Sequence, residues 1–183
     1  MGTQPETIRS ARLDLVPFEP EFLRASLAGD LVRAEQLLGA KLPADWPAPP
    51  DIYQLRLGQM EKDPSLLQWL MRGMVHRESG VLIGRIGFHT GPGPEYLREL
   101  SPGGIEFGYT VFEGHRRRGF ATEAAEALMR WARMKHGITR FVVSISPENL
   151  PSRGLAAKFG FRRIGSHIDE VDGLEDIYER VVS

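Results

Sequence analysis

Three consecutive arginines lie between two glycines in the segment Gly114-His115-Arg116-Arg117-Arg118-Gly119-Phe120-Ala121. Residues 105–111, just before it, alternate apolar with small or polar side chains, as a half-buried strand does. Residues 121–135, just after it, place apolar side chains close to helical spacing. A glycine-containing loop that enters a helix presents unpaired backbone N–H groups at the positive end of the helix dipole, where a phosphate binds well. The segment therefore predicts a site for a phosphorylated cofactor.

The segment matches neither of the common nucleotide-binding loops. A P-loop requires two glycines with four residues between them, followed by Lys-Ser/Thr. A dinucleotide fingerprint requires G-x-G-x-x-G, and the chain contains neither string. What remains is Arg116-x-x-Gly119-x-Ala121, which resembles the acetyl-CoA signature Gln/Arg-x-x-Gly-x-Gly/Ala of the GCN5-related N-acetyltransferases. Taken alone, the pattern is short, and a glycine-rich turn with a solvated basic patch is the alternative interpretation.

A second block follows in the expected order. Residues 140–146 read as a strand that Pro147 stops. Asn149 suits a helix cap, and Gly160 suits the end of the short helix that follows. Residues 149–161 resemble the family's second conserved block, which is Asn-x-x-Ser, a short helix and Lys-x-Gly-Phe. Together the two blocks cover roughly residues 105–165, and their spelling is most similar to the branch that includes the ribosomal-protein N-terminal acetyltransferases.

The resemblance implies an N-acetyltransferase (an acyltransferase) that moves acetyl from acetyl-CoA, its cosubstrate, to a primary amine by direct transfer in a ternary complex. The acceptor would be a protein N-terminus or a small-molecule amine of unknown identity. The two strands would splay apart and pair with the pantetheine arm, Gly108 would permit close approach, and the amides around Arg118 to Ala121 would hold the pyrophosphate. The residues expected to bind the cofactor are Tyr109, Val111, Arg116, Arg117, Arg118, Gly119, Phe120, Ala121, Thr122, Asn149, Ser152, Arg153 and Lys158.

Two residues are candidates for the chemistry. Acetyl transfer requires a base that removes the ammonium proton and a group that steadies the leaving thiolate. Glu106 is the candidate base or proton relay, and partial burial is expected to raise its pKa; an ordinary glutamate at a strand end is the alternative. Ser152 is the candidate donor to the sulfur, and a serine that bonds its own backbone is the alternative. The family's usual tyrosine acid has no counterpart in residues 155–161, so the acid is Ser152 or absent.

Composition excludes several other kinds of protein. The chain has no cysteine, which excludes disulfides, thiolate metal sites and a cysteine nucleophile, and we expect no metal. The net charge of −1 gives no long-range attraction to nucleic acid or to an anionic membrane. No apolar run approaches the ~18 residues of a membrane span. The first residues lack a secretory signal, which predicts a cytoplasmic protein. A monomer or homodimer is expected.

The remaining elements must position these residues. The 183 residues predict a single acetyltransferase domain, in which 8–104 form the acceptor side, 105–165 the acetyl-CoA-binding core and 166–183 the closing strands. We expect the α/β (α+β) class, with a single mixed, mostly antiparallel central sheet and helices on both faces. Predicted strands cover 12–16, 68–76, 81–89, 105–111, 140–146, 162–168 and 176–182. Predicted helices cover 19–28, 31–38, 51–62 with Asp51 as cap, 121–135 and the segment between Asn149 and Gly160.

Other polar residues have weaker interpretations. His89 ends a strand and would face the acceptor site, whereas Thr122 and Glu123 are expected to stabilise the start of their helix. His167 with Asp169 and Glu170 would suit metal ligands, but a solvated strand end is the simpler interpretation.

Two rival functions remain open. A non-catalytic acyl-CoA-binding module acting as a sensor or partner domain would bind CoA without turnover. An RNA-associated protein using the arginine loop would show salt-sensitive binding that CoA does not compete with.

Overall fold

The strands form one mixed sheet in the order β1-β2-β3-β4-β5-β6-β8-β7. The computed structural model describes residues 5–169 and 173–182. The strands are β1 (Ile8–Arg9), β2 (Leu13–Pro17), β3 (Arg72–His76), β4 (Val81–Phe88), β5 (Ile105–Val111), β6 (Arg140–Ile145), β7 (Arg162–Asp169) and β8 (Gly173–Val181). β5 and β6 pair in parallel, whereas β1–β2, β2–β3, β3–β4, β6–β8 and β7–β8 are antiparallel. The predicted mixed, mostly antiparallel sheet is therefore confirmed.

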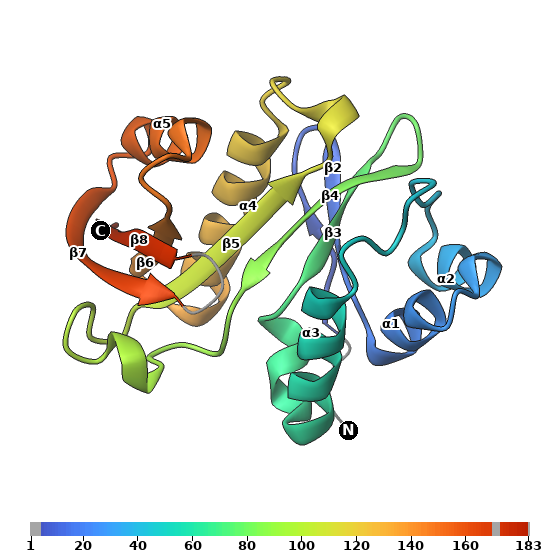
Figure 1. The fold of residues 1–183 in the computed structure, drawn as a ribbon, viewed down its shortest axis with the longest axis horizontal. Helices are drawn as coiled ribbons and strands as arrows, with labels where there is room; N and C mark the ends of the chain where they lie inside the picture. Colours follow the sequence, from blue (N-terminus) through green and yellow to red (C-terminus); the bar gives the residue numbers. More distant parts are fainter. Residues whose placement is uncertain (1–4, 170–172, 183) are drawn as a thin grey trace. The chain divides into compact units, whose positions relative to one another are not determined.

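Five α-helices and three short 3-10 helices belong to the part of the chain that the structure describes (Figure 1). The α-helices are α1 (Pro20–Leu27), α2 (Leu31–Leu38), α3 (Asp51–Lys62), α4 (Phe120–His136) and α5 (Leu150–Lys158). The 3-10 helices are η1 (Pro64–Gln68), η2 (Glu95–Leu97) and η3 (Glu113–His115). No helix in the described residues has the length and apolarity that a membrane crossing requires.

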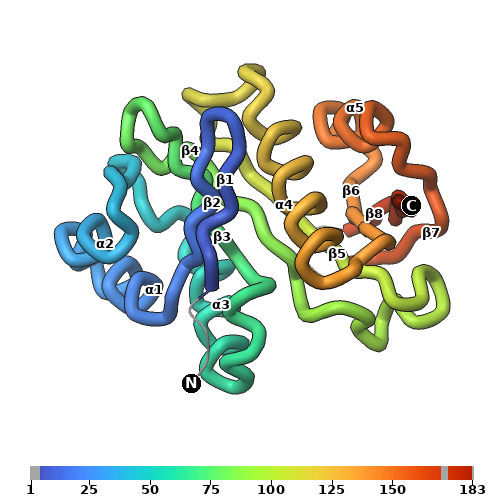
Figure 2. The backbone as a smooth tube through the Cα atoms, turned by 180° about the vertical axis from the view of Figure 1, so that it is seen from behind, coloured from blue at the N-terminus to red at the C-terminus, as the bar shows by residue number. Residues whose placement is uncertain are grey.

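The chain divides into two compact units, the first made of residues 1–87 and 109–128 and the second of residues 88–108 and 129–183. In the first unit the short hairpin of β1 and β2 pairs with β3, and its tight turn at residues 10–12 is visible in blue in Figure 2. The core beside α1, α2 and α3 is aromatic: Trp46 packs on Tyr53 with ring centroids 4.7 Å apart, and Phe18 packs on Phe22 at 4.6 Å. Phe112, which follows β5 and precedes the loop before α4, packs against the same core.

In the second unit β8 lies between β6 and β7. A small core of Leu97, Val142 and Ile177 joins the segment around η2 to this sheet. Ser101 Oγ donates to Glu179 Oε1 at 2.6 Å, and the Arg140 guanidinium bonds the same oxygen at 2.9 Å. The long Gly- and Pro-containing segment before β5 is therefore fixed to β8, and β5 enters from a defined position.

Several predicted boundaries were wrong for local reasons. Residues 64–68 form η1 instead of leading into a strand, because the Asp63 carboxylate accepts from Ser65 N–H at 3.0 Å and starts a turn. β3 therefore begins only at Arg72, not at residue 68. Asp51 is not the cap of α3: Pro50 precedes the helix, and its carbonyl accepts from Tyr53 and Gln54 at 3.0 and 3.1 Å.

The two ends of the sheet also differ from the sequence prediction. β1 was not predicted, because two residues are too few for an alternating pattern. β8 begins at Gly173, three positions before the predicted start at residue 176. Trp46, Trp69 and Trp131 are all buried.

Candidate functional site

The loop before α4 presents a row of backbone N–H groups. Arg117 and Gly119 have left-handed backbones, with φ of 61° and 81°, and this alternation curls the loop into α4. The first N–H with a helical acceptor is that of Glu123, which bonds Gly119 O at 3.1 Å. Among the described residues, none accepts from the amides of residues 117–122. We call these six amides the phosphate cradle. They lie at the N-terminus of a 17-residue helix, so their charge and geometry fit a pyrophosphate.

The side chains of the predicted cofactor residues in this loop have different surroundings. Arg116, Arg117 and Arg118 are exposed, and Arg116 Nε bonds Val111 O at 2.9 Å, so its guanidinium fixes the end of β5 to the loop. The Phe120 side chain is buried, and only its amide is available to a ligand. Ala121, Thr122 and Tyr109 are half-buried.

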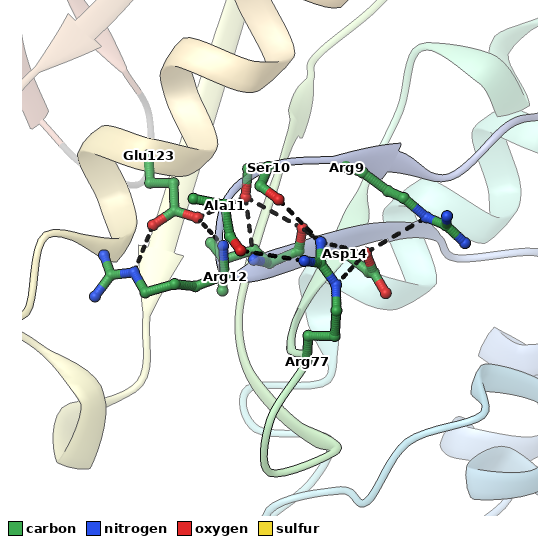
Figure 3. A network of polar contacts seen from close by, with 8 residues as sticks. Arg9, Ser10, Ala11, Arg12, Asp14, Arg77 and Glu123 are labelled. Carbon is green, nitrogen blue, oxygen red and sulfur yellow. Dashed lines mark hydrogen bonds and ion pairs between the residues drawn. The ribbon is translucent and has the colours of Figure 1, made fainter.

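Glu123 ties the start of α4 to the turn between β1 and β2 (Figure 3). Its Oε1 accepts from Ser10 Oγ at 2.7 Å and from the Arg12 amide at 2.6 Å, and its Oε2 accepts from Arg12 Nε at 2.7 Å. Glu123 was expected to stabilise its own helix start; it does so by joining that start to another element. Burial alone would raise the pKa of Glu123, but the hydrogen bonds and the positive charge of Arg12 lower it below its ordinary value.

The pKa of Glu123 predicts an acid-sensitive contribution to stability. Because the folded pKa is lowered, the stabilisation is present above the unfolded value of 4.5 and is lost as the pH falls through the folded pKa. We expect the melting temperature of Glu123→Gln to fall less steeply below pH 4.5 than that of the unmodified protein. Thermal unfolding followed by circular dichroism from pH 7 to pH 3 measures both slopes, and equal slopes would contradict the prediction.

The second unit contains a group of polar side chains around Glu106 of β5. The Glu106 side chain is only 7% exposed, and its Oε2 lies 3.7 Å from Nδ1 of His89. Ser144 of β6 and Tyr96 of η2 also hydrogen-bond this carboxylate. The amide of His89 donates to Glu106 O at 2.9 Å, so β5 and the residue after β4 are held together by backbone as well.

The expected direction of the Glu106 pKa was wrong. Burial raises the pKa, as predicted, but the hydrogen bond and charge of His89 and the hydrogen bonds of Ser144 and Tyr96 outweigh burial and hold the pKa below its ordinary value. The sequence did not indicate these three partners, because they come from other elements. Glu106 is therefore an ionised carboxylate at neutral pH.

Gly108 has no side chain, so another group can approach its backbone closely. Among the described residues, that group is the imidazole of His89. A side-chain carbon added at Gly108 would lie 2.8 Å from Nε2 of His89, which is too close for any such contact. Glu106 and Gly108 share one face of β5, since side chains two apart in a strand point the same way. The imidazole of His89 therefore lies along that face, beside the carboxylate.

The second block folds as its sequence indicated. Asn149 Oδ1 accepts from Ser152 N–H at 3.2 Å and caps α5, which confirms the predicted cap, and the helix ends at Lys158, just before Gly160. Arg153 Nη1 bonds Pro147 O at 3.0 Å. Ser152 is half-buried and Lys158 is exposed. The structure brings Asn149, Ser152 and Arg153 together at the start of one helix.

The residues that the sequence did not reveal are Arg12, Tyr96 and Ser144. Arg12 and Glu123 lie far apart in the chain, and no local pattern joins them. His167 lies 3.5 Å from Glu175 across the β7–β8 pair, as in an ordinary surface ion pair. Glu170 lies outside the described residues, and the residues that are described contain no cluster of three metal-binding side chains.

Solved structures share this fold. A protein of Vibrio cholerae described as a ribosomal-protein-serine acetyltransferase has a TM-score of 0.66 at 17% identity, covering 99% of this chain and 100% of that one. A GnaT-family acetyltransferase of Bordetella pertussis has a TM-score of 0.65 at 24% identity, covering 96% of this chain and 99% of that one. At these identities the similarity shows the fold alone, which is the predicted one.

Sequence comparison identifies the family. The N-acetyltransferase YnaD of Bacillus subtilis is 29% identical over 92 residues, which are 50% of this chain and 49% of YnaD. The chain thus spans about half the length of the relatives that it matches. The model of the acetyltransferase (GNAT) domain family matches residues 12–162, which include both motif blocks, the cradle and Glu106. This chain therefore belongs to the GNAT acetyltransferase family.

Proposed function

We propose that this protein transfers acetyl from acetyl-CoA directly to a primary amine while both are bound. The observation that carries the proposal is the cradle, in which six amides without a described acceptor lie at the start of α4 beside three exposed arginines. Backbone amides at a helix N-terminus bind a pyrophosphate without needing a dedicated side chain. The arginines add a charge attraction that salt weakens.

The cofactor would be held at three places. Residues 117–122 of the cradle would bind the pyrophosphate, and Arg116 would keep the loop against β5 through Val111. Tyr109 and Val111 belong to the strand proposed to pair with the pantetheine arm. Asn149, Ser152, Arg153 and Lys158, all at or in α5, are proposed to bind the rest of that arm and the sulfur. When bound, acetyl-CoA supplies an acetyl group activated as a thioester.

Glu106 is proposed to relay the proton of the amine. Its lowered pKa keeps it ionised at neutral pH, so it is ready to accept a proton, but it holds that proton weakly. A general base works best when its pKa lies near the operating pH, so Glu106, with its lowered pKa, would hold the proton only briefly and pass it on. His89 lies 3.7 Å from the carboxylate and is partly exposed, so the relay is proposed to open toward solvent on this side. Ser144 and Tyr96 hold the carboxylate in one orientation.

The acceptor is proposed to be a protein N-terminus or a small amine. The V. cholerae structure supports the first, because its description names a ribosomal-protein serine. A panel of amines with acetyl-CoA distinguishes the two: peptides with free N-termini, including Ser- and Ala-initiated ones, against polyamines, amino acids and aminoglycosides. Released thiol reports turnover, and the protein adds no thiol background because it has no cysteine.

The cofactor assignment predicts a thermal shift. A ligand that binds only the native state at a hundredfold excess over its dissociation constant stabilises it by about 2.7 kcal/mol. We expect CoA and acetyl-CoA to raise the melting temperature by several degrees and NAD and ATP to raise it much less, measured by dye-based thermal unfolding. Millimolar CoA without any shift would contradict the proposed function. A shift without turnover of any amine would favour a non-catalytic acyl-CoA-binding module.

A further inference from the structure

Arg12, in the turn between β1 and β2, contacts the loop–helix junction at three successive points, of which Figure 3 shows the contact with Glu123. Its Nη1 and Nη2 both donate to Arg118 O at 3.2 Å, just before the junction. Its guanidinium lies 4.4 Å from the ring centroid of Phe120, the first residue of α4. Its Nε and its amide bond the two oxygens of Glu123, in the first turn. One side chain therefore spans the segment that forms the cradle.

The bond to Arg118 O fixes the direction of a cradle amide. In a planar trans peptide the carbonyl and the next N–H point in opposite directions. Because Arg118 O is turned toward Arg12, the N–H of Gly119 points away from Arg12. The left-handed φ of 81° at Gly119 belongs to this same arrangement. Without the guanidinium fork, nothing described holds that peptide in place.

Arg12 also neutralises a charge that opposes phosphate binding. Glu123 is a carboxylate one turn into the helix whose first amides form the cradle. A negative charge there would repel a bound pyrophosphate, and the effect is stronger where solvent is partly excluded. The Glu123 side chain is only 15% exposed, and it forms an ion pair with Arg12 at 2.7 Å.

We propose that Arg12 is a positioning residue of the cofactor site, which aims the Gly119 amide through Arg118 and cancels the charge of Glu123. The proposal rests on the proposed function, since it assumes that the cradle binds a pyrophosphate. Arg12 itself need not touch the cofactor, and the acetyl acceptor plays no part in it.

Binding of three related ligands tests the positioning role. CoA and dephospho-CoA both contain the pyrophosphate, whereas pantetheine lacks it. In Arg12→Ala the affinity for CoA and for dephospho-CoA should fall by a similar factor, roughly tenfold to a hundredfold for lost bonds to a charged group. The affinity for pantetheine should not change. Isothermal titration or competition binding measures all three. A loss confined to CoA would overturn the proposal, because it would place Arg12 on the 3′-phosphate, and no loss would overturn it as well.

A second readout needs no cofactor. Trypsin cleaves after arginine, so cleavage after Arg116, Arg117 and Arg118 in the unliganded protein reports how often the loop opens. Mass spectrometry should show these cleavages several-fold faster, as a rough expectation, in Arg12→Ala. If the unmodified protein does not bind CoA, the proposed function fails while this comparison still decides whether Arg12 holds the loop. Unchanged cleavage would overturn the holding role.

The chain offers a matched control. Arg24 forms an ion pair with Glu61 at 2.8 Å in the same unit, and both side chains are about half exposed. Arg24→Ala should leave CoA affinity and cleavage after residues 116–118 unchanged. If Arg12→Ala does not fold, as its melting temperature will show, Arg12→Lys keeps the charge but loses the planar fork. It should then open the loop while keeping part of the affinity.

A double variant tests the charge role separately. Glu123→Gln alone should change CoA affinity little, because the amide oxygen still accepts from Arg12 while the negative charge disappears. In Arg12→Ala, however, the negative charge of Glu123 is left uncompensated. Adding Glu123→Gln to that variant should therefore raise its CoA affinity roughly several-fold. The recovered part should shrink at high salt. A double variant no better than Arg12→Ala at low salt would overturn the charge role.

Discussion

Gly119→Val is expected to abolish CoA binding while the protein stays folded. A non-glycine residue in the left-handed region costs about 1–2 kcal/mol, and a β-branched one costs more. Gly119 has φ of 81°, so valine will drive the loop toward another conformation. An added side-chain carbon would lie 3.6 Å from Nη2 of Arg12, an ordinary contact, so backbone strain and not a collision is the cause. Once the backbone moves, the cradle amides no longer converge.

The control for this variant lies in the same loop. Gly114 is exposed, is not among the positive-φ residues, and has nothing within 4 Å of an added side-chain carbon. Gly114→Val should therefore bind CoA nearly as the unmodified protein does. Titration calorimetry measures both affinities, and circular dichroism confirms folding. Normal CoA binding by folded Gly119→Val would place the pyrophosphate elsewhere.

The charges of the loop should matter less than its backbone. Replacing Arg117 or Arg118 by alanine removes one exposed charge, and such charges contribute up to about 1 kcal/mol, with strong screening by salt. The corresponding loss of CoA affinity should be a few-fold and should fade as salt rises. This contrast with Gly119→Val separates binding by amides from binding by side chains.

The sequence predicted best where one local pattern decides the structure. The alternation of residues 105–111 gave β5 with its bounds, and the apolar spacing of 121–135 gave α4 to within one residue at each end. The Asn149 cap was predicted because capping depends on residues only three apart. The error at residues 68–71 has the opposite origin. Apolar residues there pack into the core beside η1, and in the sequence their pattern resembles the start of a strand.

The partners of the site could not be predicted in this way. The pKa of Glu106 depends on His89, Ser144 and Tyr96, which come from a strand end, another strand and a 3-10 helix. The burial of Glu106 was correctly inferred from its position in the strand. The direction of its pKa shift was not, because it is set by neighbours that only the fold supplies. The joining of Arg12 to Glu123 is of the same kind. Local sequence therefore indicates which residues are in the site, and tertiary contacts determine their charge and orientation.

Glu106→Gln is expected to lower the maximal rate of acetyl transfer by roughly 10²–10⁴-fold, the usual contribution of a positioned base. Glutamine is nearly isosteric and keeps an acceptor oxygen for Ser144 and Tyr96, so the fold should persist. CoA affinity should be unchanged, because the cradle belongs to other residues. Glu99→Gln, at an exposed position in the same unit, is the control and should leave the rate unchanged.

The pH dependence of Glu106→Gln distinguishes a proton relay from a binder of the acceptor. If Glu106 relays the amine proton, the loss should shrink as the pH rises toward the amine's own pKa, because the acceptor then arrives neutral. If the carboxylate only attracts the acceptor's ammonium, the Michaelis constant should rise and the maximal rate should change little. Steady-state kinetics from neutral to alkaline pH with one amine separate these results. An unchanged rate and Michaelis constant would leave Glu106 without a role in transfer and would direct the search to His89, which lies beside it on the same face of β5.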